Sequence, residues 1–281
     1  MIENNIVVHI ANLETHQGQL MCYNCSMLTV VYTIIYVLIF AIGATIGSFV
    51  NVLVYRLPRD LDFVRGFSFC PACKHRLMPL DIVPIISWLL LRGRCRYCEA
   101  RISPRYLVVE AACGAAGLLL YVFIPSPTQA VLFFAIFCVL LAISLIDADT
   151  QTIFDGMNIA LGVLAVASIW LGPEVTMSSR LIGLAAVSVP LFVISIFISG
   201  AFGLGDVFLM VAAGFLLGWQ GVLTAFFIGL ILGGIYGVYV LARRKKGRKD
   251  HFAFGPCLAI GIFVSLLAGE RIIDWYLSFF R

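Results

Sequence analysis

The chain has 281 residues, of which 62% are hydrophobic and 12% are charged, and its mean hydropathy is +1.03. Soluble domains carry about 25% charged residues, so this composition excludes a soluble globular protein. The net charge of +4 is concentrated in two segments, because ten Lys and Arg residues lie between Arg56 and Arg105 and six lie between Arg243 and Lys249. We therefore expect the chain to sit in membrane lipid and to bind no nucleic acid.

Long apolar runs predict transmembrane helices, because about 20 apolar residues are needed to cross a bilayer. The fourth and sixth predicted spans are the shortest, and the two longest are the first and the seventh. The predicted spans are 28–54, 107–124, 130–146, 159–171, 181–199, 207–217, 222–241 and 254–267. The sequence thus predicts an all-α integral membrane protein with about eight transmembrane helices.

The two basic segments predict the orientation, because short loops rich in Lys and Arg stay in the cytoplasm. If residues 56–105 are cytoplasmic, eight alternating spans bring Asp147, Asp206 and the second basic segment to the same side. Both termini then lie outside.

This topology divides the chain into three parts. Residues 1–27 lack the basic start and the cleavage site of a signal peptide, so we interpret them as a dispensable N-terminal extension ahead of Met27. Residues 28–105 hold the first span and a small cytoplasmic loop with four cysteines. Residues 106–281 form a bundle of seven helices.

The loop carries two C-x2-C pairs, which are typical of a structural zinc site. The pairs are separated by 21 residues, and four thiolates at this spacing suit one tetrahedral Zn²⁺ ion. The alternatives are free thiols or disulfides, which the reducing cytoplasm disfavours. The expected metal ligands are Cys70, Cys73, Cys95 and Cys98.

The other five cysteines are not expected to bind metal. Cys22 and Cys25 are predicted to lie outside, where a disulfide or no role is expected. Three more lie in apolar spans, where cysteine packs as a small hydrophobic residue: Cys113, Cys138 and Cys257.

Two carboxylates next to apolar spans are the candidate catalytic residues. Charges in or beside membrane spans are costly and mark function. Asp147 follows the third span, and Asp206 follows two glycines, Gly203 and Gly205, that permit a tight turn. Two adjacent carboxylates cannot both ionise easily, so one acts as base and the other as acid, as in peptide hydrolysis by aspartyl proteases. The alternatives are that these residues cap helices, or that Asp149 takes the first position.

With these residues the chain resembles the type IV prepilin peptidases. Asp147 and Asp149 match the family's I-D-x-D stretch with Asp155 as the following acid, and Asp206 matches the aspartate of its G-x-G-D motif. Further motifs similar to the family's are IGSFVNV at 46–52, YRLP at 55–58, IVPIISW at 82–88, LRGRC at 91–95, SPRY at 103–106, Glu110 and FGP at 254–256.

The resemblance implies a hydrolase of the bacterial inner membrane that cuts the basic leader from prepilins or pseudopilins of type IV pili or protein secretion systems. It also implies an N-methyltransferase that uses S-adenosylmethionine, for which the sequence identifies no binding residues. The chain departs from the family at Phe154, Phe208 and Ala253, where proline, lysine and proline are usual. The substrate, the system served and the oligomeric state stay open.

Two other classes of function compete with the peptidase. A transporter would need carboxylates along a path through the bilayer, whereas here they cluster at one side. A membrane thiol oxidoreductase would use the C-x2-C pairs for redox chemistry, and metal analysis separates it from a zinc protein.

Overall fold

The computed structural model describes residues 2–63, 65–172, 175–198, 203–242 and 253–279, with side chains from residue 27 onward except 240 and 241. In these residues the regular structure is helical, and extended residues pair only in two isolated bridges. The elements are α1 (Ile2–Arg56), η1 (Leu57–Arg59), η2 (Pro79–Asp81), α2 (Ile86–Leu90), α3 (Pro104–Phe123), α4 (Pro127–Thr150), α5 (Asp155–Leu171), α6 (Met177–Ala186), α7 (Ser188–Phe197), α8 (Leu204–Ala242) and α9 (Gly255–Ser278).

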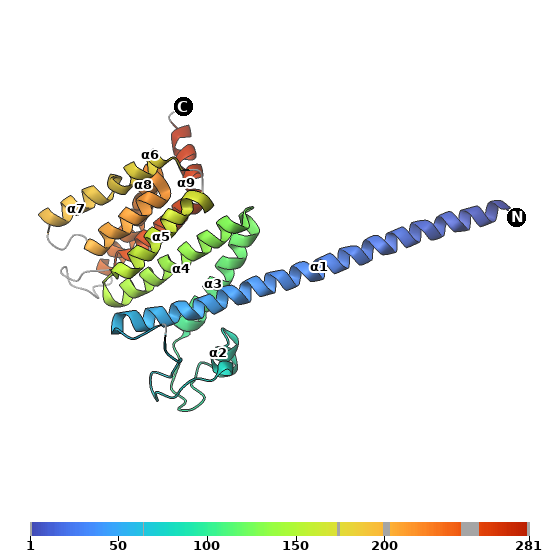
Figure 1. Cartoon of the computed structure of the whole chain (residues 1–281), viewed down its shortest axis with the longest axis horizontal. Helices are drawn as coiled ribbons and strands as arrows, with labels where there is room; N and C mark the ends of the chain where they lie inside the picture. The colour runs from blue at the N-terminus through green and yellow to red at the C-terminus, as the bar shows by residue number, and fades with distance from the viewer. Residues whose placement is uncertain (1, 64, 173–174, 199–202, 243–252, 280–281) are drawn as a thin grey trace.

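Six helical segments among the described residues are long and apolar enough to cross a membrane. They are Met27–Arg59, Pro104–Phe123, Pro127–Thr150, Met177–Phe197, Leu204–Tyr239 and Gly255–Ser278, and α5 is a shorter apolar helix. The fourth of these joins α6 and α7, which Figure 1 shows following one another along one side of the bundle.

Helix α8 is two antiparallel segments joined at Gly218. Gly218 has a φ of 71°, a left-handed conformation that glycine adopts without a steric penalty. The first segment packs on α6, where Gly214 contacts Gly183. The second packs on α9 in the opposite direction, because Gly221 lies next to Ser265 and Gly229 next to Leu258.

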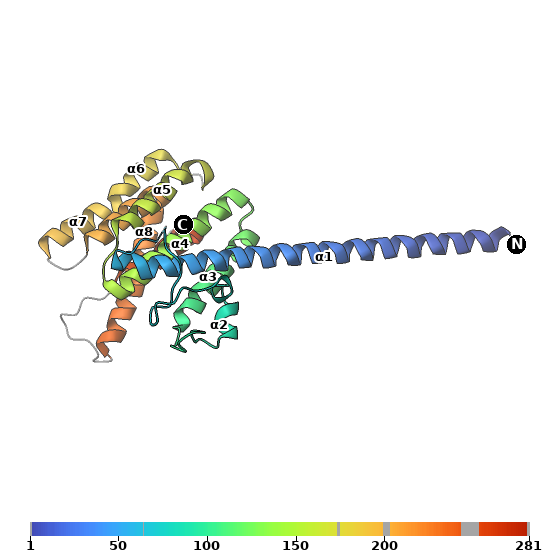
Figure 2. The same ribbon diagram turned by 60° about the horizontal axis from the view of Figure 1, so that its bottom comes forward.

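With α8 divided in this way, the described residues contain eight apolar segments, as the sequence predicts. The division coincides with the gap between the predicted sixth and seventh spans. The first predicted span, 28–54, lies within the candidate span Met27–Arg59. Helix α1 also continues N-terminally to Ile2, so that it is about 80 Å long at 1.5 Å per residue. Figures 1 and 2 show its N-terminal part extending far beyond the bundle.

Small residues set the close packing of α1 on α3. A Cβ atom on Gly43 would lie 2.7 Å from the Cys113 carbonyl oxygen, and one on Gly47 would lie 2.9 Å from the Glu110 Cα atom. Such close backbone approach is typical of membrane helix pairs, in which packing and interhelical hydrogen bonds drive association. This contact fixes α3, and the C-terminal part of α1, beside the bundle.

The buried apolar core lies where α4, α5, α8 and α9 meet. Its fully buried side chains include Ile136, Leu161, Met210 and Leu258. Large apolar side chains elsewhere are exposed, as expected for helices that face lipid. Residues 57–103 lie on the other side of α1 from α4 to α9, as Figure 1 shows for the segment that contains α2.

Candidate functional site

Asp147 is a buried carboxylate in the last turn of α4. Asp147 is 5% exposed. Its Oδ2 atom accepts a hydrogen bond of 2.9 Å from the backbone N–H of Gly255. Gly255 is the first residue of α9. A Cβ atom at Gly255 would lie 2.7 Å from that same oxygen, so glycine is required for this contact. The FGP motif therefore holds Asp147 in place from a distant part of the chain.

Asp206 is half-buried in the first turn of α8. Its Oδ2 atom accepts a hydrogen bond of 3.1 Å from the backbone N–H of Gly203. The preceding Gly205 packs against Ile153, and a Cβ atom there would lie 2.8 Å from the Ile153 Cβ atom. Because Ile153 follows α4, this contact places Asp206 at the same end of the bundle as Asp147. The two candidate carboxylates thus lie at one end of the bundle, which we call the carboxylate end.

Both candidate carboxylates also accept a backbone N–H at the start of a helix, as expected if they cap helices. Asp147 accepts an N–H from the start of α9, and Asp206 accepts one from the residue before α8. A carboxylate that accepts a backbone N–H is favoured in its charged form. Capping therefore orients both carboxylates and leaves their other oxygens available for chemistry.

The neighbouring aspartates lie apart from this pair. Asp149 is exposed and forms two hydrogen bonds of 2.8 and 2.6 Å with the guanidinium of Arg105, which also donates to the Leu145 carbonyl. Asp155 is exposed at the start of α5. The geometry favours Asp147 over Asp149 for the first position.

The departures from the family pattern are two half-buried residues and one exposed residue. Phe154 precedes α5 and packs against the cluster around Val50 and Val54 of α1. Phe208 is 53% exposed, so its side chain faces away from the core. Ala253 is half-buried before α9.

The four cysteines predicted to bind zinc lie together. Their sulfur atoms are all within 4.8 Å of one another, and no other such group occurs among the described residues. Both C-x2-C pairs form the same turn: the N–H of Lys74 donates to the Cys70 carbonyl, and that of Glu99 donates to the Cys95 carbonyl. Lys74 and Glu99 both have positive φ angles, of 60° and 56°. Two matching turns aim four sulfurs at one point.

The chemistry of this set of donors fits a metal ion. A backbone N–H from Ala100 lowers the pKa of the Cys98 thiol, but burial and hydrogen bonds with the other three thiols raise it to about 12. Four thiols this close cannot ionise together unless a cation replaces their protons. Tetrahedral Zn²⁺ does so at Zn–S distances of about 2.3 Å. The side chains of Cys22 and Cys25, which lie in α1, and the basic segment 243–249 fall outside what the structure describes.

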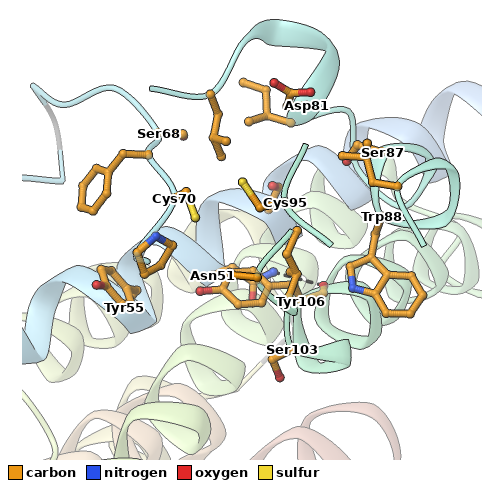
Figure 3. A pocket seen from close by; sticks show the side chains of 18 of the residues that line it. Asn51, Tyr55, Ser68, Cys70, Asp81, Ser87, Trp88, Cys95, Ser103 and Tyr106 are labelled. Atoms are coloured by element: carbon orange, nitrogen blue, oxygen red, sulfur yellow. Dashed lines mark hydrogen bonds between the residues drawn. The ribbon is translucent and has the colours of Figure 1, made fainter. Parts of the chain in front are cut away.

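A cavity of about 400 Å³ separates the cysteine loop from α1 and α3. Figure 3 shows Tyr55, Tyr106 and Trp88 around it, with the sulfurs of Cys70 and Cys95 facing one another above. The sequence motifs at 46–52, 82–88 and 103–106 all contribute lining residues. Sequence reasoning identified these motifs but missed the cavity, because it is built from three distant segments.

Polar groups in the cavity wall are held by the backbone. Glu110 is 8% exposed, and its Oε2 atom accepts a hydrogen bond of 2.7 Å from the Ile85 N–H. The Asn51 amide donates to the Tyr106 carbonyl at 3.2 Å. The indole N–H of Trp88 is buried without a partner among the described residues. The cavity therefore offers a carboxylate, aromatic rings and a free donor.

Comparison with known proteins identifies the family. The model of the bacterial peptidase A24 N-terminal domain matches residues 41–124, and that of the type IV leader peptidase family matches residues 132–238. A prepilin leader peptidase/N-methyltransferase of Aeromonas salmonicida (strain A449) is 30% identical over 261 residues, covering 82% of this chain and 90% of its own.

Two other relatives carry the same name. That of Stutzerimonas stutzeri is 32% identical over 262 residues, covering 83% of this chain and 91% of its own length. That of Bacillus subtilis (strain 168) is 29% identical over 235 residues, covering 82% and 93%. No solved structure matches the chain. With its two family matches, its relatives and its apolar helices, the chain belongs to the type IV leader peptidase family and is a multi-pass membrane peptidase.

Proposed function

We propose that the chain is an aspartyl endopeptidase whose catalytic residues are Asp147 and Asp206. One observation carries the proposal: α4 and α8 bring these two carboxylates to the same end of the bundle, and a glycine N–H orients each of them. The relatives are named prepilin leader peptidases. The pair is the part of this chain suited to that reaction.

The reaction needs one carboxylate charged and its partner protonated. Two carboxylates that interact cannot both ionise without a cost in free energy, so the pair shares a proton. The charged member removes a proton from water, which attacks the scissile carbonyl carbon. The protonated member donates to the carbonyl oxygen and later to the leaving amine. No covalent intermediate forms.

We propose prepilins or pseudopilins as substrates, cut between a basic leader and an apolar helix. The cut lies where such a substrate leaves the bilayer, which is the depth of the carboxylate end of the bundle. The basic segments at 56–105 and 243–249 favour a cytoplasmic position for this end, in the bacterial inner membrane.

The test is cleavage of a purified prepilin by the purified chain in liposomes. We expect a single cut, and mass spectrometry of the product should place the new N-terminus directly before the apolar helix. A substrate in which the basic leader residues are replaced by acidic ones should be cut more slowly. An active preparation that leaves the intact prepilin uncut would contradict the proposal.

We further propose that the cavity beside the cysteine loop binds S-adenosylmethionine for N-methylation. Its observed lining favours this cofactor, because a sulfonium cation is attracted by aromatic faces and by a carboxylate. Trp88, Tyr106 and Glu110 would hold it there. When bound, the cofactor supplies the methyl group. These residues orient it and keep the methyl-bearing sulfur away from water.

Isothermal titration with S-adenosylmethionine tests this second activity. We expect Glu110→Gln and Trp88→Phe to weaken binding about tenfold or more, because each removes one polar partner of about 1.4 kcal/mol or more. Ser265→Ala, in a helix that does not line the cavity, should bind as the original chain does. Unchanged binding in both cavity variants would place the cofactor elsewhere.

We propose a structural Zn²⁺ ion on the four loop cysteines. The purified chain should contain one zinc ion, and Cys98→Ser should lose it, since three thiolates bind the ion more weakly than four. Because the ion must displace thiol protons, its apparent affinity should fall as the pH is lowered. A metal-free chain with a redox-active disulfide would support the oxidoreductase alternative instead.

The structure gives no support to a transporter. Among the described residues of the helices, the buried acidic residues are Asp147 and Glu110, and both lie toward the carboxylate end, while the buried Asp81 side chain lies in the cysteine loop. A path for ions would need further carboxylates toward the other end of the bundle.

A further inference from the structure

Asn158 is a buried polar residue next to the carboxylate pair that the proposed reaction does not use. It lies in the first turn of α5, one turn after Asp155, and it is 7% exposed. A polar side chain at this depth costs free energy unless its hydrogen bonds are satisfied. Its hydrogen bonds therefore show which parts of the molecule it holds together.

The amide nitrogen of Asn158 donates a hydrogen bond of 3.3 Å to the carbonyl oxygen of Gly205. Gly205 directly precedes Asp206, so this bond fixes the peptide unit that carries the second carboxylate. Ile153 presses on Gly205 as well. Asn158 and Ile153 thus set the position of the G-x-G-D turn relative to α4 and α5.

The amide oxygen of Asn158 is buried and has no partner among the described residues. The orientation of the amide follows from chemistry, because the Gly205 carbonyl can only accept and the nitrogen must face it. An unsatisfied buried acceptor costs free energy, which the fold tolerates here beside the G-x-G-D turn.

A purely structural role would be an ordinary interhelical hydrogen bond. Ser265 is such a case, since its hydroxyl donates at 2.7 Å to the Gly221 carbonyl, also in α8, so that its one polar atom has a partner. Asn158 differs in two respects: its bond is made to the residue next to a candidate catalytic carboxylate, and it retains a free acceptor.

We propose that Asn158 is a positioning residue of the peptidase, which fixes Asp206 through the Gly205 carbonyl. This inference rests on the proposed function, because it assigns a role within that reaction. It predicts an effect on turnover more than on substrate binding.

The experiment measures kcat and KM for prepilin cleavage by three variants of the full chain, each normalised to the folded fraction. Asn158→Leu removes the hydrogen bond to the Gly205 carbonyl and the free acceptor while keeping the branched shape of the side chain. Asn158→Asp keeps the shape and an acceptor. Ser265→Ala is the matched control, because it removes an interhelical bond to α8 far from the carboxylates.

We expect Asn158→Leu to lower kcat at least tenfold and to change KM less than threefold, while Ser265→Ala stays within twofold of the original chain. Asn158→Asp should regain activity as the pH is lowered, because a protonated carboxyl can again donate to Gly205. Equal kcat values for Asn158→Leu and Ser265→Ala would overturn the inference, as would an Asp variant no better than the Leu variant at any pH. If the original chain itself does not cleave, the proposed function fails instead.

Discussion

Gly255 is the position at which the absence of a side chain matters most for the Asp147 carboxylate. Its N–H binds the Asp147 carboxylate, and a Cβ atom would lie 2.7 Å from the same oxygen. Overpacking of this kind costs about 1 to 3 kcal/mol. We expect Gly255→Ala to lower kcat for prepilin cleavage about tenfold or more, because the added methyl group displaces Asp147.

Gly162→Ala in α5 is the matched control for this change. No atom lies within 4 Å of the Cβ position at Gly162, and alanine favours a helix by about 1 kcal/mol. It should keep full activity. If both alanine variants cleave equally well, Gly255 does not hold the carboxylate for catalysis.

Individual residues also show the limit of sequence reasoning. Asp147 and Asp206 could be selected from the sequence as candidate site residues, because charges are rare in apolar chains. The partner of Asp149 could not be identified, because Arg105 lies 44 positions away and only the packing of α3 against α4 joins them. The sequence did not indicate a role for Asn158, since a single asparagine among apolar residues matches no motif.

At the scale of helices, the pair of Arg105 and Asp149 joins α3 to the helix that carries Asp147. Arg105 also donates to the Leu145 carbonyl near the end of α4. Both side chains are partly exposed, so solvent screening limits the pair to about 1 kcal/mol or less. We expect Arg105→Lys to lower kcat about threefold, because a single lysine nitrogen cannot hold both the Asp149 carboxylate and the Leu145 carbonyl as the two guanidinium nitrogens do.

A double-mutant cycle with Asp149→Asn measures this coupling directly. The combined variant should lose no more activity than Arg105→Lys alone, since the contact is already broken. Arg271→Ala, at an exposed position of α9, should leave kcat unchanged. Full additivity of the two losses would show that the pair transmits nothing to α4.

The contact between α1 and α3 gives a second prediction for helices. A methyl group on Gly47 would lie 2.9 Å from the Glu110 Cα atom, whereas one on Gly117 would meet the nearest atom at 3.5 Å. We expect Gly47→Ala to destabilise the chain by about 1 to 3 kcal/mol and Gly117→Ala to have little effect. Thermal unfolding in detergent measures both. Equal stability of the two variants would mean that α1 is free to move away from α3.

Across the whole molecule, the N-terminal part of α1 extends beyond the bundle that holds the site. Residues 2–26 continue the helix away from the bundle, and neither the carboxylates nor the cavity involve them. We expect a chain beginning at Met27 to insert and to cleave a prepilin at an unchanged rate. Loss of cleavage by this shortened chain would show that residues 1–26 belong to the working enzyme.

The span count was predictable because bilayer thickness fixes the length of an apolar run. The break in α8 was predictable for the same reason, since 39 helical residues are too long for one crossing. Two features were not predictable. The helical state of residues 2–26 has no apolar periodicity to reveal it, and the cavity needs α1, the cysteine loop and α3 to meet in space.

The central claim is that Asp147 and Asp206 form one catalytic pair, and cleavage of a prepilin by the two single asparagine variants tests it most directly. Asparagine keeps the shape of each side chain but can neither take up nor release the proton. We expect Asp147→Asn and Asp206→Asn each to lower kcat by at least a thousandfold, and the double variant to be no slower than either. A single variant that cuts the prepilin at the original rate would contradict the account.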